Sequence, residues 1–221
     1  MTLEDALAET PVIAILRGVR PEEIEAHAEA LHAAGVRVVE APLNSPAPLD
    51  SIRRLCAWRG RLVCGAGTVL TPERVDAVAE AGGEIIVAPN TDPAVITRAV
   101  ERGLPALPGF ATATEAFTAI AAGARHLKLF PASSMGSAHL KALKAVLPPE
   151  VQVHAVGGVG PAAFAEWRAA GAAGFGLGSE LYKPGQTPAE TTAKAQAVVA
   201  AVRALPPLSQ AQPRSQAATA P

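Results

Sequence analysis

One lysine in an apolar run is well suited to covalent chemistry in this 221-residue sequence. Lys128 stands in the run HLKLF, where strand geometry would turn Leu127 and Leu129 to one face and Lys128 to the other. Lysine is seldom fully buried unless it is paired or has a function, and desolvation favours the neutral amine that attacks carbonyl carbon. We predict that Lys128 is a Schiff-base nucleophile. The alternative is a lysine that extends to solvent or forms a structural ion pair.

A carboxyl group that suits proton transfer ends another apolar run. Glu40 closes VRVVE, and alternation would put Val36 and Val38 on its face, so an unpaired structural carboxyl there would be costly. Schiff-base chemistry needs a proton shuttle, and we predict that Glu40 is the general acid and base beside Lys128. A plain salt bridge is the alternative.

Two further polar residues follow apolar runs and suit an anionic substrate. Arg17 follows VIAIL, and Thr68 ends GAGT. A guanidinium offers a planar fork of donors, so Arg17 and Thr68 together are candidates for holding a substrate carboxylate. Each residue alone is weak evidence for such a site.

Two glycine-rich turns, VGGVG at 156–160 and GLGSE at 176–180, predict a phosphate site. Glycines let backbone N–H groups approach an anion, and barrels commonly bind phosphate after their last two strands. Tight turns without a ligand are the alternative. Neither turn has the spacing of a dinucleotide-binding fingerprint. The five histidines contain no H-x-x-x-H pair, so we expect no metal and no cofactor.

The elements that must position these residues form a repeat of strand, loop and helix. Eight short apolar or β-branched runs predict strands at 12–16, 36–40, 61–65, 84–88, 104–108, 126–130, 151–156 and 173–178. Near-continuous apolar strands separated by helices are typical of a parallel sheet covered by helices. We therefore predict a single α/β domain, a (β/α)8 TIM barrel over residues 1–205, in which catalytic groups gather at the carboxyl ends of the strands. An open doubly wound sheet is the alternative.

Helix boundaries are marked by prolines, caps and glycines. Helices are predicted to begin at Pro21, Pro72, Pro93 and Pro161, with caps at Thr71 and Asp92 and a capping box from Thr112 to Glu115. Helices are predicted to end at Gly35, Gly82, Gly103, Gly123 and Gly171. The first ten residues predict an extra short helix under the barrel. The tail 206–221 lacks a periodic apolar face and is predicted to be disordered.

Composition narrows the function classes. A formal net charge of -1 indicates no nucleic-acid partner and no membrane surface, and no apolar run approaches the roughly 20 residues of a membrane span. The N-terminus has no signal-peptide pattern. Cys56 and Cys64 fit no metal or redox spacing and are expected to be reduced thiols. We expect a cytoplasmic enzyme that acts on a small molecule.

Six segments in matching order resemble the class I 2-keto-3-deoxy-6-phosphogluconate/4-hydroxy-2-oxoglutarate aldolase family over residues 10–205. They are AILRG, VEAPLNSP, GAGTVL, PGFATATEA, LKLFP and AVGGV. Within the family, the likeness is greatest to the 2-dehydro-3-deoxy-6-phosphogalactonate aldolases. The sequence departs from the gluconate branch at Asn44, where that branch has arginine, and at Val156, where it has threonine.

The resemblance implies a role for each candidate residue. Lys128 would form the Schiff base and Glu40 would shuttle protons, while Arg17 and Thr68 would hold the pyruvate end of the substrate. Other expected substrate contacts are Pro89, Asn44, Phe130 and Val156, and the phosphate ligands would be Gly157, Gly158, Gly178 and Ser179. The resemblance also implies a homotrimer, a phosphorylated keto sugar acid as substrate and pyruvate as product.

Other functions remain open from the residues alone. The same chemistry on the 6-phosphogluconate epimer or on 4-hydroxy-2-oxoglutarate is the nearest alternative. A phosphosugar isomerase or epimerase would use Glu40 as base and Lys128 only as an electrostatic clamp. A non-catalytic barrel that binds an anionic metabolite is the third possibility. Only a Schiff-base enzyme should form a covalent adduct with pyruvate under borohydride.

Overall fold

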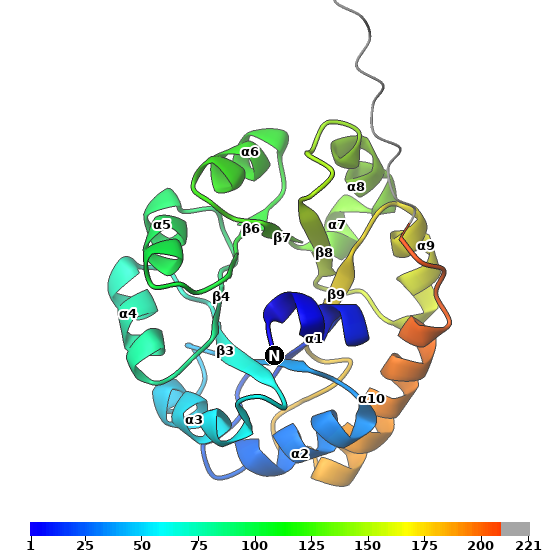
Figure 1. Cartoon of the computed structure of the whole chain (residues 1–221). Coiled ribbons are helices and arrows are strands. Elements are labelled where there is room, and N and C mark those ends of the chain that lie inside the picture. The colour runs from blue at the N-terminus through cyan, green and yellow to red at the C-terminus, as the bar shows by residue number, and fades with distance from the viewer. Residues whose placement is uncertain (209–221) are drawn as a thin grey trace, which may run out of the picture.

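The computed structural model describes residues 1–208, and its parallel strands form one sheet that curves into a barrel (Figure 1). The strands are β1 (Val12–Ile15), β2 (Val38–Pro42), β3 (Val63–Gly67), β4 (Ile85–Val87), β5 (Ala106–Leu107), β6 (Gly109–Phe110), β7 (His126–Leu129), β8 (Gln152–Val156) and β9 (Gly174–Leu177). Hydrogen-bonded neighbours follow the order β5-β4-β3-β2-β1-β9-β8-β7-β6. This sequential order confirms the predicted barrel and is not that of a doubly wound sheet.

The fifth predicted strand is divided in the structure. β5 pairs with β4 and β6 pairs with β7, and only Pro108 separates the two short strands. Proline has no N–H to donate to a ladder, although the Pro108 carbonyl still accepts from the Lys128 backbone N–H at 2.9 Å. β5 and β6 therefore act as one interrupted strand that joins the two ends of the sheet.

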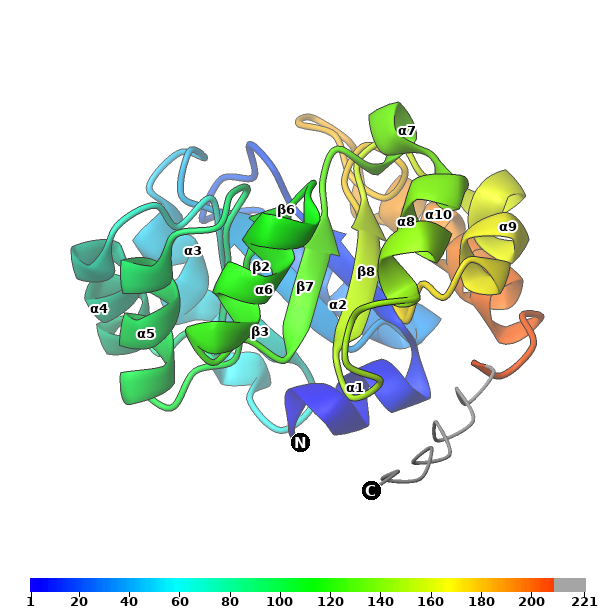
Figure 2. The ribbon, with the colours of Figure 1, turned by 90° about the horizontal axis from the view of Figure 1, so that it is seen from above.

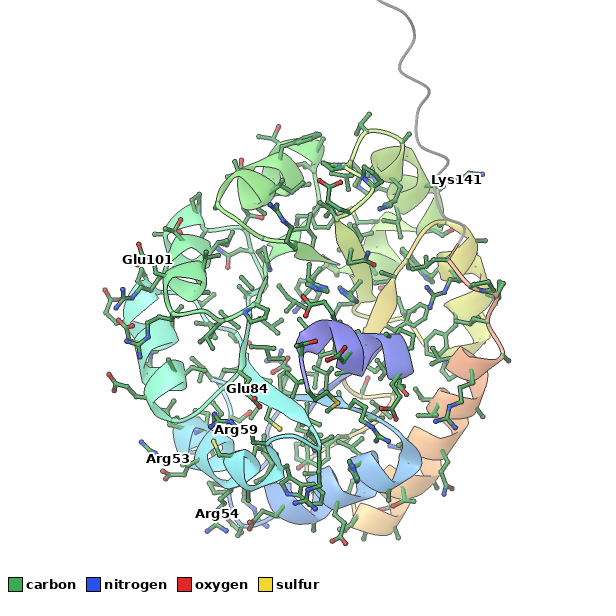
Figure 3. All side chains as sticks on the ribbon, in the orientation of Figure 1. Arg53, Arg54, Arg59, Glu84, Glu101 and Lys141 are labelled. Carbon is green, nitrogen blue, oxygen red and sulfur yellow. The ribbon has the colours of Figure 1, made fainter. Side chains whose placement is uncertain are left out.

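Helices surround the strands. They are α1 (Leu3–Glu9), α2 (Ile24–Ala34), α3 (Pro48–Leu55), α4 (Pro72–Glu80), α5 (Pro93–Glu101), α6 (Ala113–Ala121), α7 (Ala132–Met135), α8 (Ser137–Lys144), α9 (Phe164–Ala169) and α10 (Pro188–Arg203), with 3-10 turns η1 (Cys56–Trp58) and η2 (Pro161–Ala163). Charged side chains such as Arg53, Glu101 and Lys141 point outward from this ring (Figure 3).

Most of the predicted helix boundaries are confirmed. Thr71 and Asp92 cap α4 and α5, and Thr112 with Glu115 forms a capping box on α6. All five predicted helix-ending glycines have positive φ, as at Gly35 with φ 103°. The predicted start at Pro21 is wrong, because residues 21–23 form a turn and α2 begins at Ile24.

Two apolar layers follow from the alternation of the strands. Leu127 and Leu129 pack outward in the large core between strands and helices. A second cluster fills the lower part of the barrel interior: Leu3, Ala6, Leu7, Ile13, Val38, Val63, Ile85, Val87 and Leu107. Val36 belongs to the outer core, so its predicted place on the face of Glu40 is wrong; it precedes β2 and does not continue the strand's alternation.

The predicted N-terminal helix lies beneath the barrel. α1 crosses one end of the barrel, and the carboxyl ends of the strands, marked by the arrowheads of β7 and β8, lie at the opposite end (Figure 2). The buried side chains of α1 belong to the inner cluster, which explains how this end is filled. The part of the predicted tail from residue 209 onward lies outside the described residues.

Candidate active site

Lys128 lies inside the barrel, as its position in HLKLF predicts. It sits on β7 in register with Gly109 on one side and His154 on the other, and only 6% of it is exposed. Its Nζ atom is 4.6 Å from the centre of the Phe130 ring. Burial lowers the pKa of Lys128, the Glu40 carboxyl opposes this effect, and the Arg17 guanidinium adds to it. The site therefore favours the neutral, nucleophilic amine.

Glu40 lies inside the same barrel on β2 and is 1% exposed. Burial raises its pKa to about 7, even though Lys128, Arg17 and the backbone N–H of Gly67 act to lower it. Within residues 1–208, its Oε2 atom has no hydrogen-bond partner. A buried carboxyl that titrates near neutral pH can both donate and accept a proton.

Gly67 is a residue that our sequence analysis missed. A Cβ atom placed on Gly67 would lie 2.2 Å from Oε2 of Glu40, so only glycine leaves room for this carboxyl. The signal was present in the sequence, because Gly67 is part of the GAGT segment. Thr68 follows at once with φ 58°, a left-handed backbone conformation that is rare for a β-branched residue. Strain of this kind is concentrated at functional sites.

Arg17 is exposed at the carboxyl end of β1, beside the loop that follows β2. Its Nη1 atom donates a hydrogen bond to Oδ1 of Asn44 at 2.7 Å. The guanidinium influences the pKa of both Glu40 and Lys128, which associates Arg17 with the interior pair. Asn44 is exposed, and its side-chain oxygen is engaged with Arg17.

The first predicted glycine turn and Lys128 both lie against the ring of Phe130. A Cβ atom on Gly157 would be 3.1 Å from the Phe130 ring, and the Lys128 amine lies over the same ring. Gly157 has φ 94° and Gly158 has φ 70°, so both use backbone freedom that other residues lack. The first glycine turn and the lysine thus occupy one neighbourhood.

The remaining predicted contacts surround this neighbourhood. Pro89 packs its carbonyl against Gly109, the register neighbour of Lys128, and Val156 is buried over Gly176. In the second glycine turn, Ser179 is exposed, and a Cβ atom on Gly178 would meet open space. Both turns therefore leave backbone accessible at the carboxyl end of the barrel.

Two observations concern membrane spans and metal sites in the part of the chain that the structure describes. No helix within residues 1–208 is long and apolar enough to cross a membrane. In the same part of the chain, no group of three or more histidine, cysteine, aspartate or glutamate side chains is arranged to hold a metal ion.

These features define a class of protein. A (β/α)8 barrel carries a buried amine of lowered pKa and a carboxyl of pKa about 7 in one interior, next to glycine turns at the carboxyl ends of its strands. An amine nucleophile with an acid/base partner is suited to carbonyl chemistry through an imine.

Comparison with known proteins identifies the family. The family model described as KDPG and KHG aldolase matches residues 3–198, so the chain belongs to this aldolase family, whose members are carbon–carbon lyases. The predicted resemblance is thereby confirmed. The 2-dehydro-3-deoxy-6-phosphogalactonate aldolase of Escherichia coli K12 is 53% identical over 194 residues, which are 87% of this chain and 95% of that protein.

Solved structures agree with this assignment. A structure described as native KDPGal is 52% identical, with a TM-score of 0.87 and coverage of 88% of this chain and 95% of that one. The KDPG aldolase of Legionella pneumophila, with pyruvate captured as a covalent carbinolamine intermediate, is 28% identical. Its TM-score is 0.79, with coverage of 88% of this chain and 96% of that one.

Proposed function

We propose that this aldolase cleaves 2-dehydro-3-deoxy-6-phosphogalactonate to pyruvate and D-glyceraldehyde 3-phosphate through a Schiff base on Lys128. The observation that carries the proposal is the burial of the Lys128 amine on the interior face of β7, where desolvation lowers its pKa. The substrate follows from the name of the E. coli relative. The covalent pyruvate in the Legionella enzyme supports the same type of intermediate here.

The chemistry follows from the two interior groups. The neutral Lys128 amine attacks the C2 carbonyl, and protonated Glu40 gives its proton to the departing hydroxyl, so that water leaves, a protonated imine forms and Glu40 becomes a carboxylate. Glu40, as carboxylate, takes the proton of the C4 hydroxyl, the C3–C4 bond breaks, and its electrons pass into the imine to form an enamine. The aldehyde leaves, Glu40 returns its proton to C3, and water releases pyruvate and the free amine. A carboxyl of pKa about 7 is suited to both proton transfers.

The remaining predicted residues are proposed to bind the two ends of the substrate. Arg17, Thr68, Pro89 and Phe130 bind the pyruvate end. The phosphate ligands are the backbone of Gly157, Gly158 and Gly178 with the Ser179 hydroxyl. We connect the choice of C4 epimer with Asn44 and Val156.

Borohydride trapping tests the proposal. Reduction in the presence of pyruvate should inactivate the enzyme and add mass at Lys128, while Lys128→Ala should stay folded and lose nearly all activity. Labelling at another residue, or no labelling, would contradict the Schiff-base mechanism. Isomerisation or epimerisation of a phosphosugar without any adduct would favour an isomerase or epimerase that uses Glu40 as base.

Assembly and location complete the proposal. A homotrimer follows from the family resemblance, and large exposed apolar side chains such as Val100 and Phe117 are suitable for an interface between copies. A cytoplasmic location accords with the free thiols at Cys56 and Cys64.

A further inference from the structure

Arg17 is a cation whose side-chain hydrogen bond goes to a neutral partner. Its Nη1 atom lies 2.7 Å from the Asn44 side-chain oxygen, the length of a strong charge-assisted hydrogen bond. Among residues 1–208, no carboxylate oxygen lies within ion-pair distance of this guanidinium, whereas Arg20, Arg37 and Arg53 each pair with an acid. Asn44 therefore orients the guanidinium without neutralising its charge.

The backbone around this contact is held by other groups. The Gly18 N–H donates to the Ser45 hydroxyl at 2.9 Å, and Ser45 is buried. The Ser45 N–H in turn donates to the Pro42 carbonyl at 2.9 Å. Because these bonds hold the two loops independently of Asn44, and because Asn44 is exposed, we expect the loops to keep their fold when its side chain is removed.

The orientation of Arg17 matters because its charge acts on the reacting groups. Arg17 continues the alternation of β1, which turns Ile13 into the barrel and Val12, Ala14 and Leu16 to the outer core, and its guanidinium lowers the pKa of Glu40 and of Lys128. An exposed arginine without a partner would lose considerable side-chain entropy when it orders on a ligand. A neutral oxygen that holds it beforehand reduces that loss and leaves its other donors for a carboxylate.

We propose that Asn44 is a positioning residue, which holds the Arg17 guanidinium at the carboxyl end of β1 so that Arg17 is ready for the carboxylate of the keto acid. This inference rests on the proposed function, since it concerns how pyruvate is bound before the imine forms. In this role Asn44 acts through Arg17 and not as the direct substrate contact that the family resemblance implies. An aspartate at this position would keep the hydrogen bond and cancel the charge that the substrate needs.

A double-mutant cycle with borohydride trapping tests the inference. The readout is the pyruvate concentration that gives half-maximal trapping at Lys128. Asn44→Ala should raise it about three- to tenfold, the value of one hydrogen bond, and leave the trapping rate at saturating pyruvate and the melting temperature near wild type. Arg17→Ala should raise it further, and the double variant should equal Arg17→Ala. Asn44→Asp should also weaken pyruvate binding, and Asn90→Ala, an exposed asparagine after β4, is the matched control.

Three results would overturn the inference. An unchanged half-saturation in Asn44→Ala means that Arg17 does not depend on Asn44. An equal effect of Asn44→Ala with and without Arg17 means that Asn44 contacts the substrate directly. If no variant is trapped, wild type included, the proposed function fails and the inference fails with it. Normal trapping of the wild type with either of the first two results removes only the role of Asn44.

Discussion

At the level of single residues, the site brings two titratable groups of opposite type toward the same pH. Desolvation raises the pKa of the Glu40 carboxyl to about 7 and lowers that of the Lys128 amine. In water the ordinary pKa values are 4.5 for the carboxyl and 10.5 for the amine, so each group would be fully ionised at neutral pH. Because burial disfavours both charges, the interior holds an amine able to attack and a carboxyl able to exchange protons.

Glu40→Gln should lower turnover by about 10²- to 10⁴-fold, the usual contribution of general acid–base catalysis, while pyruvate still binds. The same variant should also become more stable than wild type as pH rises. In wild type, the folded carboxyl keeps its proton up to about pH 7 whereas the unfolded one loses it near 4.5, so stability is lost across this interval. The variant's advantage over wild type in the free energy of unfolding should therefore be larger at pH 8 than at pH 5, by on the order of 1–3 kcal/mol, and thermal melting at the two pH values measures it. Near-normal turnover would reduce Glu40 to a structural role.

Val156 should decide the preference between the C4 epimers. It is 4% exposed at the carboxyl end of β8, and it offers only methyl groups where the gluconate branch offers a threonine hydroxyl. A site with a polar partner for one hydroxyl discriminates strongly, because the wrong epimer leaves a buried group unpaired. We expect a higher kcat/KM on the galactonate epimer and a shift toward the gluconate epimer in Val156→Thr. A wild type that prefers the gluconate epimer, or a ratio that Val156→Thr leaves unchanged, contradicts the assignment while the aldolase chemistry stands.

At the level of elements, sequence pattern located the strands because each is a short apolar run between recognisable turns. All eight predicted runs contain observed strand residues, and Lys128 is on the interior face because the leucines on either side of it suit the helices. The pattern failed where local sequence does not decide geometry. Pro108 divides a strand whose two halves still close the barrel, and Val36 lies before its strand begins.

Contacts between the ends of different strands could not be predicted from the sequence. The hydrogen bond from Arg17 to Asn44 spans 27 residues, and the fit of Glu40 against Gly67 joins β2 to β3. Side-chain direction at loop positions depends on the final register of neighbouring strands, which periodicity does not encode. The candidate residues were therefore predictable as a set, and their pairwise roles required the fold.

Thr68→Gly should separate stability from function at the end of β3. Thr68 has φ 58°, and glycine adopts this conformation without a steric penalty, so the variant should keep or raise the free energy of unfolding by up to about 1 kcal/mol. Loss of the hydroxyl should nevertheless raise the pyruvate concentration for half-maximal trapping about tenfold. Thr68→Ser, which retains the hydroxyl, is the control. A marked drop in melting temperature for Thr68→Gly would show that the side chain is needed for the fold.

At the scale of the whole molecule, the two ends of the barrel differ, and β7 contributes a side chain to each of them. Lys128 points into the barrel toward the reacting end, while His126, earlier on the same strand, contacts His154 at 3.1 Å and Glu4 of α1 at 3.4 Å. Burial lowers the pKa of His154 to about 3, so it stays neutral at physiological pH. The inner apolar cluster and the contacts of His126 with His154 and Glu4 attach α1 beneath the strands. α1 covers this end of the barrel, and the loops at the other end carry the predicted substrate contacts.

The last prediction concerns assembly and follows from exposed apolar side chains on the outer surface. Val100 on α5 and Phe117 on α6 are 49% and 44% exposed, and Val100 also lies against Gly123 at the end of α6. Large apolar side chains on adjacent helices are costly in water and suit an interface in a symmetric oligomer. Light scattering should give a mass about three times the 22.5 kDa of the chain. Phe117→Glu should dissociate the assembly because a carboxylate would be buried without a partner.

Val146→Glu is the matched control, since Val146 is 58% exposed in the turn after α8 and belongs to neither α5 nor α6. It should keep the trimeric mass and wild-type activity. A wild type with the mass of a single chain contradicts the trimer altogether. A trimer that survives Phe117→Glu but not Val146→Glu would move the interface to the α8 side, because only the substitution inside the contact can place an unpaired charge between subunits.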